Sequence, residues 1–580
     1  MAFDVILESA SIYDGAGTQP ITNDIGLRGE RIAAIGNLKQ AEAAQRVDCR
    51  GLAACPGFVD IHSHADMTLH RENHPALLEP LVRQGITTFV GGNCGVSMAP
   101  VSREHRRHQM SFYDFFLGED PEPLVRWNSF GELLDHYERQ GMVMNAAVLA
   151  PHGMLRLDAM ADRDGPPAVP ELKQMKAALA ECMEAGAVGL STGLMYFPGL
   201  MSDEWELAEL ARVVHDYNGV FTSHLRSYNS DTLEAAIDEV LHVGREAEVP
   251  VQISHLFWIP NYPRPFDDWS KKGVKFLSAL HKKRPFKMPL DFGIRPILHK
   301  LDGLIAQGAA IGIDAMPTSA GFTHLIAFFP PWSLAGGWSE IKKRLADPQT
   351  RREIRRSIEE GEPVWPHRGQ DSWSMNLFKV MGWDCAYIMS VKSKKNAHLI
   401  GHGFAELADE TGKHPFDVAC DLLLEEEGRV LIFETATYPG DPLIEQSLRG
   451  TLLDPNVSIV TDTILLGFGM PSHLFYDCYP KFLGEYARER GELSLTEAIR
   501  KCTSLPTRQL RIASRGMIRE GWFADLVVFD EKRIRSRSSA ADPAHYPDGV
   551  RYVFINGRAV VDPDGYHPQP LAGRLIRRGH

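Results

Sequence analysis

Between about residues 55 and 511 the chain repeats one pattern: a short apolar run ends in polar or glycine residues and is followed by a helix-like stretch. Apolar strands that alternate with helices are typical of a parallel sheet covered on both faces. Eight such runs favour closure into a (β/α)8 TIM barrel, an α/β fold. The runs lie at residues 57–61, 86–90, 144–149, 187–190, 219–222, 251–254, 309–313 and 457–461. Two further strand-like runs, 399–400 and 430–433, can each displace one of the eight.

The two ends of the chain have a different texture, in which apolar and polar residues alternate in short runs. These runs lie at residues 4–12, 25–28 and 31–35 at one end and at 524–529 and 551–557 at the other. Alternation with a period of two predicts strands. Neither fragment can bury a core alone, so we expect residues 1–55 and 512–565 to pair as one small composite β-sandwich domain. The barrel then occupies residues 56–511.

Residues 322–395 depart from the barrel rhythm. They hold several tryptophans and prolines and one charged helical segment, IKKRLADPQTRREIRRSIEEG. Active sites of parallel barrels are built from the loops that follow strands, so we expect this segment to be an insertion over the barrel mouth. The basic residues of the helical segment are mixed with acidic ones, which favours a solvated helix face over a binding patch.

The charge balance excludes one class of partner. The 62 Lys and Arg residues are outnumbered by 75 Asp and Glu residues, and the formal net charge of −13 is opposite to that of a nucleic-acid-binding protein. No stretch reaches the ~20 apolar residues of a membrane helix, and the first residues lack the pattern of a signal peptide. Eight widely spaced cysteines without a CxxC pair indicate reduced thiols and a cytoplasmic location.

Several predicted strands end in histidine or aspartate. His62 and His64 close the first strand two positions apart, so both side chains point to the same face. Among 23 histidines in 580 residues, an HxH pair is expected about once by chance, so the pair alone is weak evidence. His224 and His255 each close another predicted strand, and Asp462 closes the last one.

Cys94 lies just past the second predicted strand, in the glycine-rich turn GGNCG. The carboxyl ends of parallel barrel strands meet at one face, so Cys94 and the strand-end residues are expected to converge there. Imidazole, thiolate and carboxylate ligands together suit Zn²⁺. Taken singly, a buried cysteine, a hydrogen-bonded histidine or an aspartate that caps a helix is the more frequent explanation. Five strand ends that carry such groups together favour a metal site.

At this point the sequence resembles a known superfamily. The segments that carry the likeness are GFVDIHSHAD, GNCG, HLR at His224, QISH ending at His255, Asp462 after an apolar strand, and TSLP followed by GMIREGWFADLVVFD. Together they resemble the amidohydrolases, and within these the D-aminoacylase or N-acyl-D-amino-acid deacylase branch. The likeness covers nearly the whole chain outside the insertion and the C-terminal end, and GNCG is its narrowest motif.

The resemblance implies a zinc site in a (β/α)8 barrel with a composite β domain. Most of the superfamily bridges its metals with a carboxylated lysine, whereas this branch uses a cysteine, which is matched here by Cys94. His224 and His255 match the ligands of one tightly held zinc that shares this cysteine. A second, often weakly occupied metal position is matched by His62, His64 and Asp462.

The resemblance also implies how the site works. Zinc lowers the pKa of a bound water and polarises a carbonyl oxygen. Asp462 is placed to accept the water proton and pass it to the leaving nitrogen, because an unprotonated amine leaves poorly. Tyr196, after the fourth predicted strand, is either a donor to the oxyanion or a packing residue. Asp66, just after HSH, either orients a ligand histidine or lies in an exposed loop.

Three positions depart from the deacylase pattern. This branch holds the substrate carboxylate with a lysine, a tyrosine and an arginine, and the matching positions here are Phe257, Met316 or Thr318, and about His473. The loss of these partners favours a substrate without a carboxylate, such as a more apolar amide, carbamate or cyclic amide. Alternatively, Arg226 or Arg264 binds the carboxylate instead.

The leading interpretation is a zinc-dependent hydrolase of a non-peptide C–N bond in a small-molecule amide, with Asp462 and Tyr196 as catalytic residues. The candidate substrate-binding residues are Arg226, Phe257, His473 and Asp66. A cyclic amidase, carbamate hydrolase or deaminase of the same superfamily is an alternative. A non-catalytic binding protein on an inactive barrel is a third, although all the expected ligands are present. Neither nucleic acid nor a membrane is an expected partner, and a homo-oligomer stays open.

Overall fold

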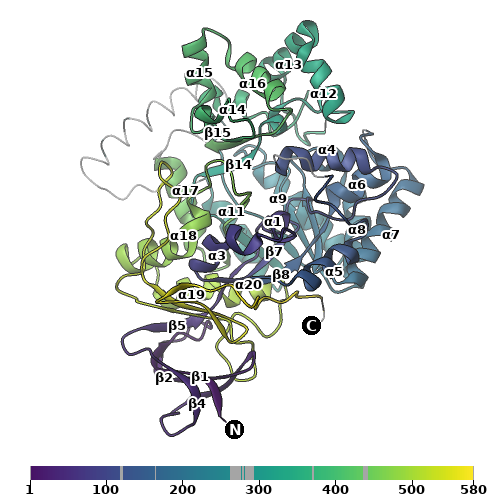
Figure 1. The fold of residues 1–580 in the computed structure, drawn as a ribbon. Coiled ribbons are helices and arrows are strands. Elements are labelled where there is room, and N and C mark those ends of the chain that lie inside the picture. The colour runs from purple at the N-terminus through teal and green to yellow at the C-terminus, as the bar shows by residue number, and fades with distance from the viewer. Residues whose placement is uncertain are drawn as a thin grey trace.

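A computed structural model describes residues 2–117, 122–163, 165–261, 293–368, 371–435 and 442–578, together with the single positions 273, 276 and 280. Figure 1 shows a β-rich part at the bottom with the N-terminus, a central part in which helices surround strands, and a smaller mixed part at the top. The central part positions the candidate ligands, and the upper part completes the pocket beside them.

Two parallel sheets form the centre. One has the strand order β6-β7-β8 and the other β17-β13-β12-β11-β10-β9. Because β9 directly follows β8 along the chain, the two sheets continue into one another there. The strands are β6 (Phe58–Asp60), β7 (Ile86–Gly91), β8 (Asn145–Val148), β9 (Ala150–Pro151), β10 (Gly189–Gly193), β11 (Val220–His224), β12 (Val251–Ile253), β13 (Ile311–Ala315) and β17 (Val457–Ile459). The prediction that all eight runs form strands is confirmed.

The first and last of these strands also meet. The backbone N–H of Asp462 donates to the carbonyl oxygen of His62 at 2.9 Å, and the backbone N–H of His64 donates to the carbonyl oxygen of Thr463 at 2.8 Å. The parallel strands therefore continue from the end of β17 to the end of β6. The segments that follow the strands gather at one end of the central part.

Neither of the two further strand-like runs displaces a parallel strand. The first contributes to a single 3-10 turn, Ala397–Leu399. The second forms β16 (Val430–Thr435), but this strand lies between β14 (Ala320–His324) and β15 (Ala386–Val391) in a separate antiparallel sheet.

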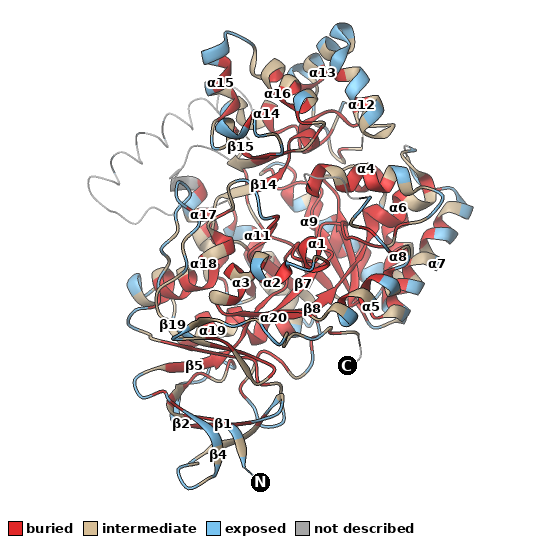
Figure 2. Cartoon of the chain, viewed as in Figure 1, coloured by how far each residue is buried: buried red, intermediate tan, exposed pale blue. Residues whose placement is uncertain are grey.

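Helices cover the outside of the parallel strands, and α5 (Phe130–Gln140) shows how the sequence produces them. The Ser129 hydroxyl accepts the backbone N–H of Glu132, whose carboxylate accepts the N–H of Ser129 in return. Leu133, Leu134 and Tyr137 then fall on one buried face. Figure 2 shows such buried residues throughout the centre of the molecule.

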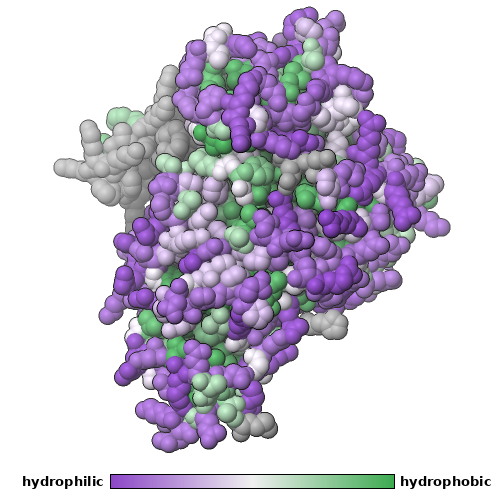
Figure 3. Space-filling view, in the orientation of Figure 1, coloured by the Kyte–Doolittle hydropathy of each residue, from purple (hydrophilic) through white to green (hydrophobic). Residues whose placement is uncertain are grey.

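The remaining helices of the central part have these bounds: α1 (Asp66–Leu69), α2 (His74–Leu77), α3 (Glu79–Arg83), α4 (Arg106–Leu117), α6 (His152–Met160), α7 (Val169–Ala185), α8 (Glu204–Asp216), α9 (Leu233–Glu246), α11 (Arg295–Ala306), α17 (Pro442–Leu453), α18 (Leu474–Lys481), α19 (Leu495–Cys502) and α20 (Ser504–Gln509). In the part of the chain that the structure describes, no helix combines the length and the apolar content needed to cross a bilayer. Figure 3 shows mainly hydrophilic residues on the face in view.

Strands from both ends of the chain pair in one sheet, with the order β21-β20-β19-β18-β5-β1-β2-β3 and β4 beside β1. The two ends meet where β5 (Ala53–Pro56) runs antiparallel to β18 (Leu526–Phe529), with Cys55 opposite Val527. Alternate residues of these strands, including Leu7 and Leu27, form an apolar cluster that packs against the sheet. The other strands are β1 (Phe3–Ile12), β2 (Ile21–Arg28), β3 (Arg31–Gly36), β4 (Ala43–Asp48), β19 (Val550–Ile555), β20 (Arg558–Asp562) and β21 (Gly565–Tyr566).

The upper part of the molecule begins with β14 and ends with β16. It therefore extends beyond the predicted insertion, residues 322–395. Because β14 pairs with β16, the chain leaves the antiparallel sheet only after Thr435. The charged helical segment forms ion pairs inside this part, where Arg351 binds Asp417 and Asp421, and Lys342 binds Glu427. The helices of this part are α12 (Gly337–Ala346), α13 (Pro348–Glu360), α14 (Leu377–Met381), α15 (Phe404–Thr411) and α16 (Pro415–Glu425).

The buried Asp525 carboxylate ties the terminal sheet to β8. It accepts hydrogen bonds from the Arg515 guanidinium, from the Asn145 side chain at 3.2 Å and from the Asn556 backbone N–H at 2.8 Å. Asp525→Ala leaves the Arg515 charge buried without its partner, so we expect the free energy of unfolding to fall by about 3–5 kcal/mol in urea denaturation. Asp564→Ala, in an exposed turn of the same sheet, is the control. Equal stability of the two variants would contradict this role.

Candidate metal centre

Six side chains with metal-binding donors gather where the parallel strands end. All six are buried. Their donor atoms form three overlapping groups, within each of which the atoms lie within 4.8 Å of one another. His62 and His64 follow β6, Cys94 follows β7, His224 ends β11, His255 follows β12 and Asp462 follows β17. The expected convergence of strand-end residues therefore occurs.

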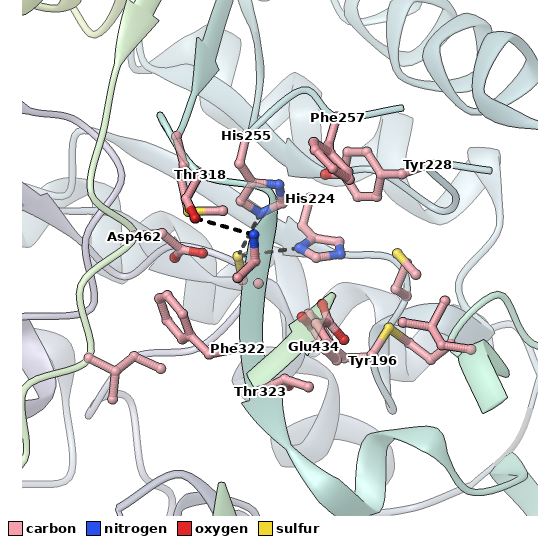
Figure 4. Close-up of a pocket in the computed structure, with 18 of the residues that line it drawn as sticks. Tyr196, His224, Tyr228, His255, Phe257, Thr318, Phe322, Thr323, Glu434 and Asp462 are labelled. Atoms are coloured by element: carbon pink, nitrogen blue, oxygen red, sulfur yellow. Dashed lines mark hydrogen bonds between the residues drawn. The ribbon is translucent and has the colours of Figure 1, made fainter. Parts of the chain in front are cut away.

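Cys94 lies at the centre of this cluster. Its Sγ is 3.3 Å from Nε2 of His62, 3.6 Å from Nδ1 of His224 and 3.7 Å from Nε2 of His255. Zinc bonds to nitrogen and sulfur ligands hold the donor atoms of a tetrahedral site about 3.3–3.8 Å apart. The spacing therefore fits a zinc ion held by Cys94 and the two strand-end histidines, and Figure 4 shows His224 and His255 turned toward the same point.

A second group of donors surrounds Asp462. Its Oδ1 lies 3.4 Å from Nε2 of His62 and 3.3 Å from Nε2 of His64. His62 belongs to both groups, because the same nitrogen lies 3.3 Å from Sγ of Cys94. The donor sets of the two metal positions implied by the resemblance are thus adjacent.

Three of the donors stand on unusual backbone. Cys94, His255 and Asp462 have φ angles of 53°, 33° and 54°, in the left-handed region that residues other than glycine rarely adopt. Such strain is concentrated at functional sites. The turn before Cys94 also needs a glycine, because a Cβ on Gly92 would lie 2.3 Å from the carbonyl oxygen of Leu149. The GGNCG motif therefore allows the close approach that carries Cys94 into the site.

Burial controls the protonation of these groups. It holds the pKa of His224 well below its ordinary value and raises the pKa of the Cys94 thiol well above its own. For Asp462 burial opposes ionisation, but the interaction with His62 and the hydrogen bond with His64 lower its pKa below the usual range. Neutral imidazoles and a carboxylate are the forms that bind a metal. The Cys94 thiol ionises when a cation lies beside it.

Asp314, at the end of β13, supports the site but was not among the predicted residues. Its Oδ1 accepts the backbone N–H of His255 at 2.6 Å and lies 3.7 Å from Nδ1 of His62, and its Oδ2 accepts the Gln252 side chain at 2.6 Å. Burial raises its pKa to about 7. Its position after an apolar run is the same sequence signal that pointed to Asp462.

Two other predicted residues reach the pocket beside the donors. The Tyr196 ring lies 4.7 Å from the His224 ring, centroid to centroid. Phe257 lines the opposite side, near Tyr228 (Figure 4). Both positions are compatible with substrate contact.

Arg226 does not line the pocket, so its expected role in binding a substrate carboxylate needs correction. Its guanidinium is buried and forms a bidentate ion pair with Glu239 of α9, at 2.8–3.0 Å. It also donates to the carbonyl oxygens of Leu200 and Ser202. These partners occupy its donors and neutralise its charge. Arg264, the other arginine considered, lies outside the described residues.

His473 and Asp66 are not among the described residues that line the pocket, and their contact with substrate stays a prediction. Nε2 of His473 lies 3.2 Å from Nζ of Lys481, and burial together with this charge lowers the pKa of His473 to about 3. Asp66 is buried, not in an exposed loop, and accepts the Ser97 hydroxyl at 2.8 Å. That it orients a ligand histidine stays a prediction.

The pocket next to the metal-binding donors is mainly apolar. No lysine or arginine is among the described residues that line it. Glu434 of β16 also lines it and was not among the predicted residues, although it directly follows the strand-like run 430–433. The apolar lining comes from Val96, Phe116, Met195, Phe257, Ile259, Met316, Phe322, Met375, Leu377, Met381 and Ile464.

The sequence model of the "Amidohydrolase family" matches residues 45–339 and 456–561. The chain belongs to the amidohydrolase family. The two matched stretches contain all six metal-binding donors. Residues 340–455 lie outside the match and include most of the upper part together with α17. This amidohydrolase therefore departs most from the family pattern in that segment.

Three relatives place this amidohydrolase in the D-aminoacylase branch. It is 30% identical to the N-acyl-D-glutamate deacylase of Alcaligenes xylosoxydans xylosoxydans, over 99% of this chain and 96% of that protein. It is 27% identical to the D-aminoacylase of the same organism, over 99% and 98% of the two chains. The crystal structure of N-acyl-D-glutamate deacylase from Bordetella bronchiseptica, complexed with zinc and a phosphonate mimic of the tetrahedral intermediate, superposes with a TM-score of 0.74, 26% identity and full coverage of both chains.

Zinc binding is expected to depend on Cys94, because its sulfur contacts three of the four histidines of the cluster. We expect Cys94→Ala to lose the tightly bound zinc, measured by elemental analysis of purified protein after dialysis against a weak chelator. Cys182→Ala, at another buried free cysteine, controls for the loss of a thiol. Full zinc content in Cys94→Ala would remove this residue from the site.

Proposed function

We propose that this protein is a zinc-dependent hydrolase of a non-peptide C–N bond, with chemistry like that of the N-acyl-D-amino-acid deacylases. The observation that carries the proposal is the position of the Cys94 sulfur, 3.3–3.7 Å from three histidine nitrogens and beside the Asp462 group. All of these donors belong to the segments that match the amidohydrolase family.

The metal is held by two adjoining donor sets. Cys94, His224 and His255 bind one zinc tightly, and a second position is formed by His62, His64 and Asp462. When bound, zinc activates water as a nucleophile and polarises the acyl oxygen. The protein contributes donors that are buried in a fixed arrangement. Asp314 accepts the backbone N–H of His255 and lies beside His62, and so helps to orient both residues.

Asp462 is the proposed general base and acid. It lines the pocket, and its lowered pKa keeps it ionised and able to accept a proton from the attacking water. The same carboxyl then donates the proton to the leaving nitrogen. Tyr196 lines the pocket beside His224, and because burial raises its pKa well above the ordinary value, its phenol stays protonated and can donate to the oxyanion.

We propose that the chain consists of a barrel, a small β domain and an insertion. Residues 56–511 form a (β/α)8 barrel that carries the metal ligands, residues 1–55 and 512–565 form the small β-sandwich domain, and residues 322–395 are an insertion at the barrel mouth. The closure between the ends of β17 and β6 supports the barrel, and β16 ties residues up to Thr435 to the insertion.

The pocket favours a less acidic, more apolar amide over an N-acyl amino acid. Its described lining is mainly apolar and carries no lysine or arginine, whereas Arg226 is neutralised by Glu239. A cyclic amide or a carbamate fits the same lining and is the second candidate. All eight cysteines are free thiols, which supports a reducing compartment such as the cytoplasm.

The role of Asp462 is tested by Asp462→Asn. Loss of a positioned base is expected to lower kcat by about 100- to 10,000-fold. The tightly bound zinc should remain, because its three ligands are unchanged, and elemental analysis checks this. Asp409→Asn, on the exposed face of α15, is the matched control. A kcat within a factor of two of the wild type would exclude Asp462 as the proton shuttle.

The reaction class is tested with zinc-loaded protein and a panel of N-acetyl-D-amino acids, neutral arylamides and cyclic amides. We expect turnover of neutral amides with a higher kcat/KM than of the carboxylates, because the described pocket offers no cation to a carboxylate. Turnover confined to the carboxylates would refute the changed specificity. Absence of turnover over the whole panel would refute amide hydrolysis.

A further inference from the structure

Glu434 brings a carboxyl group into the apolar wall of the pocket. β16 pairs with β14 so that Glu434 stands opposite Gly321. Both residues line the pocket together with Tyr196 and Phe322. Figure 4 shows the Glu434 side chain near Tyr196 and across the pocket from Phe257. The carboxyl group therefore faces the space that a substrate enters.

This carboxyl group lacks a partner in the described part of the chain. Its Oε2 is buried and has no hydrogen-bond partner among the described residues. Burial, and then the charge of Asp462, raise the pKa of Glu434 to about 7. A buried polar atom without a partner is unfavourable, and such an atom in a native protein calls for a functional explanation.

The opposite strand helps to hold the group in place. A Cβ on Gly321 would lie 2.7 Å from Oε1 of Glu434. The absence of a side chain at Gly321 therefore leaves the space that this oxygen occupies. A hydrogen-bond acceptor held in a fixed place gives specificity.

The same arrangement opposes a substrate carboxylate. Glu434 and Asp462 both line the pocket, and no lysine or arginine does so among the described residues. A substrate carboxylate beside the ionised Glu434 is disfavoured by like charge, and no described basic side chain in the pocket offsets this repulsion. An amine or a carboxamide, by contrast, brings the N–H groups that an unpartnered carboxyl oxygen accepts.

We propose that Glu434 is a specificity residue that accepts a hydrogen bond from a nitrogen-borne donor of the substrate. The substrate class is then an N-acylated compound that carries an amine or a carboxamide in place of a free carboxylate. This inference rests on the proposed amide hydrolysis and names its substrates. It also assigns specificity to the upper part, since β14 and β16 carry the residues involved.

The test uses four N-acetyl compounds on one D-leucine skeleton, which end in a carboxylate, a methyl ester, a carboxamide or a primary amine. The ester has neither a charge nor a donor, so it separates recognition of the donor from a preference for neutral substrates. For zinc-loaded wild type we expect kcat/KM for the carboxamide or the amine to exceed that for the ester by about 10- to 100-fold, the range of a hydrogen bond to a charged group. The carboxylate should be the poorest substrate.

Glu434→Leu removes the acceptor and should bring the donor-bearing compounds to within about threefold of the ester, while Glu434→Gln should weaken the amine more than the carboxamide. Thermal unfolding of Glu434→Leu should be unchanged or higher, because an unpartnered polar group is replaced by an apolar one. Glu410→Leu, exposed on α15, controls for the loss of a carboxylate from the upper part.

Calorimetric binding of the same four compounds to zinc-free protein separates this inference from the proposed function. If no compound is hydrolysed but wild type binds the donor-bearing compounds more tightly than Glu434→Leu does, amide hydrolysis fails and the role of Glu434 stands. If hydrolysis occurs and the ester equals the donor-bearing compounds in both wild type and Glu434→Leu, the role of Glu434 is refuted. Equal binding of all four compounds refutes it as well.

Discussion

The candidate site depends on the hydrogen bonds that join the last parallel strand to the first. Thr461 donates through its backbone N–H to the Asp60 carboxylate, a partner 401 positions away along the chain. One residue further on, the Asp462 backbone N–H donates to the carbonyl oxygen of His62. Parallel strands cannot be joined by tight turns, so the chain has to build the intervening strands and helices before these ends can meet. The closure brings the histidines that follow the first parallel strand and the aspartate that follows the last one within reach of one metal ion.

The donors in that volume are arranged at a cost in free energy. Imidazoles, a thiol and a carboxylate are buried there, and three of the residues that carry them have left-handed backbone. A bound cation offsets this cost because it neutralises the carboxylate and stabilises the thiolate. Asp314 contributes by holding the backbone of His255 and facing His62. The site is thus a preorganised cluster of buried donors that a bound cation would stabilise.

The candidate metal donors and the pocket beside them differ in how far the sequence predicts them. The donor residues stand at the ends of apolar strands, so the strand pattern itself indicates that His224, His255 and Asp462 converge. Part of the pocket wall comes from the upper part, whose antiparallel sheet does not follow that pattern. Glu434 directly follows the strand-like run 430–433, but it was missed because that run was considered only as a possible barrel strand. Arg226 was misjudged because its partner Glu239 lies on the following helix, and no local pattern shows that the two side chains form a buried ion pair.

The sequence by itself determined the eight parallel strands, the residues at their ends and the chemistry those residues share, because strand formation and side-chain alternation are local properties of the chain. Only the tertiary structure decided which side chains face one another. It placed Cys94 between three imidazoles, turned Arg226 away from the pocket and put the Glu434 carboxyl opposite Gly321. The physical reason is that hydrogen bonds and ion pairs at the site join residues far apart in the sequence, whose approach is set by the packing of whole strands and helices.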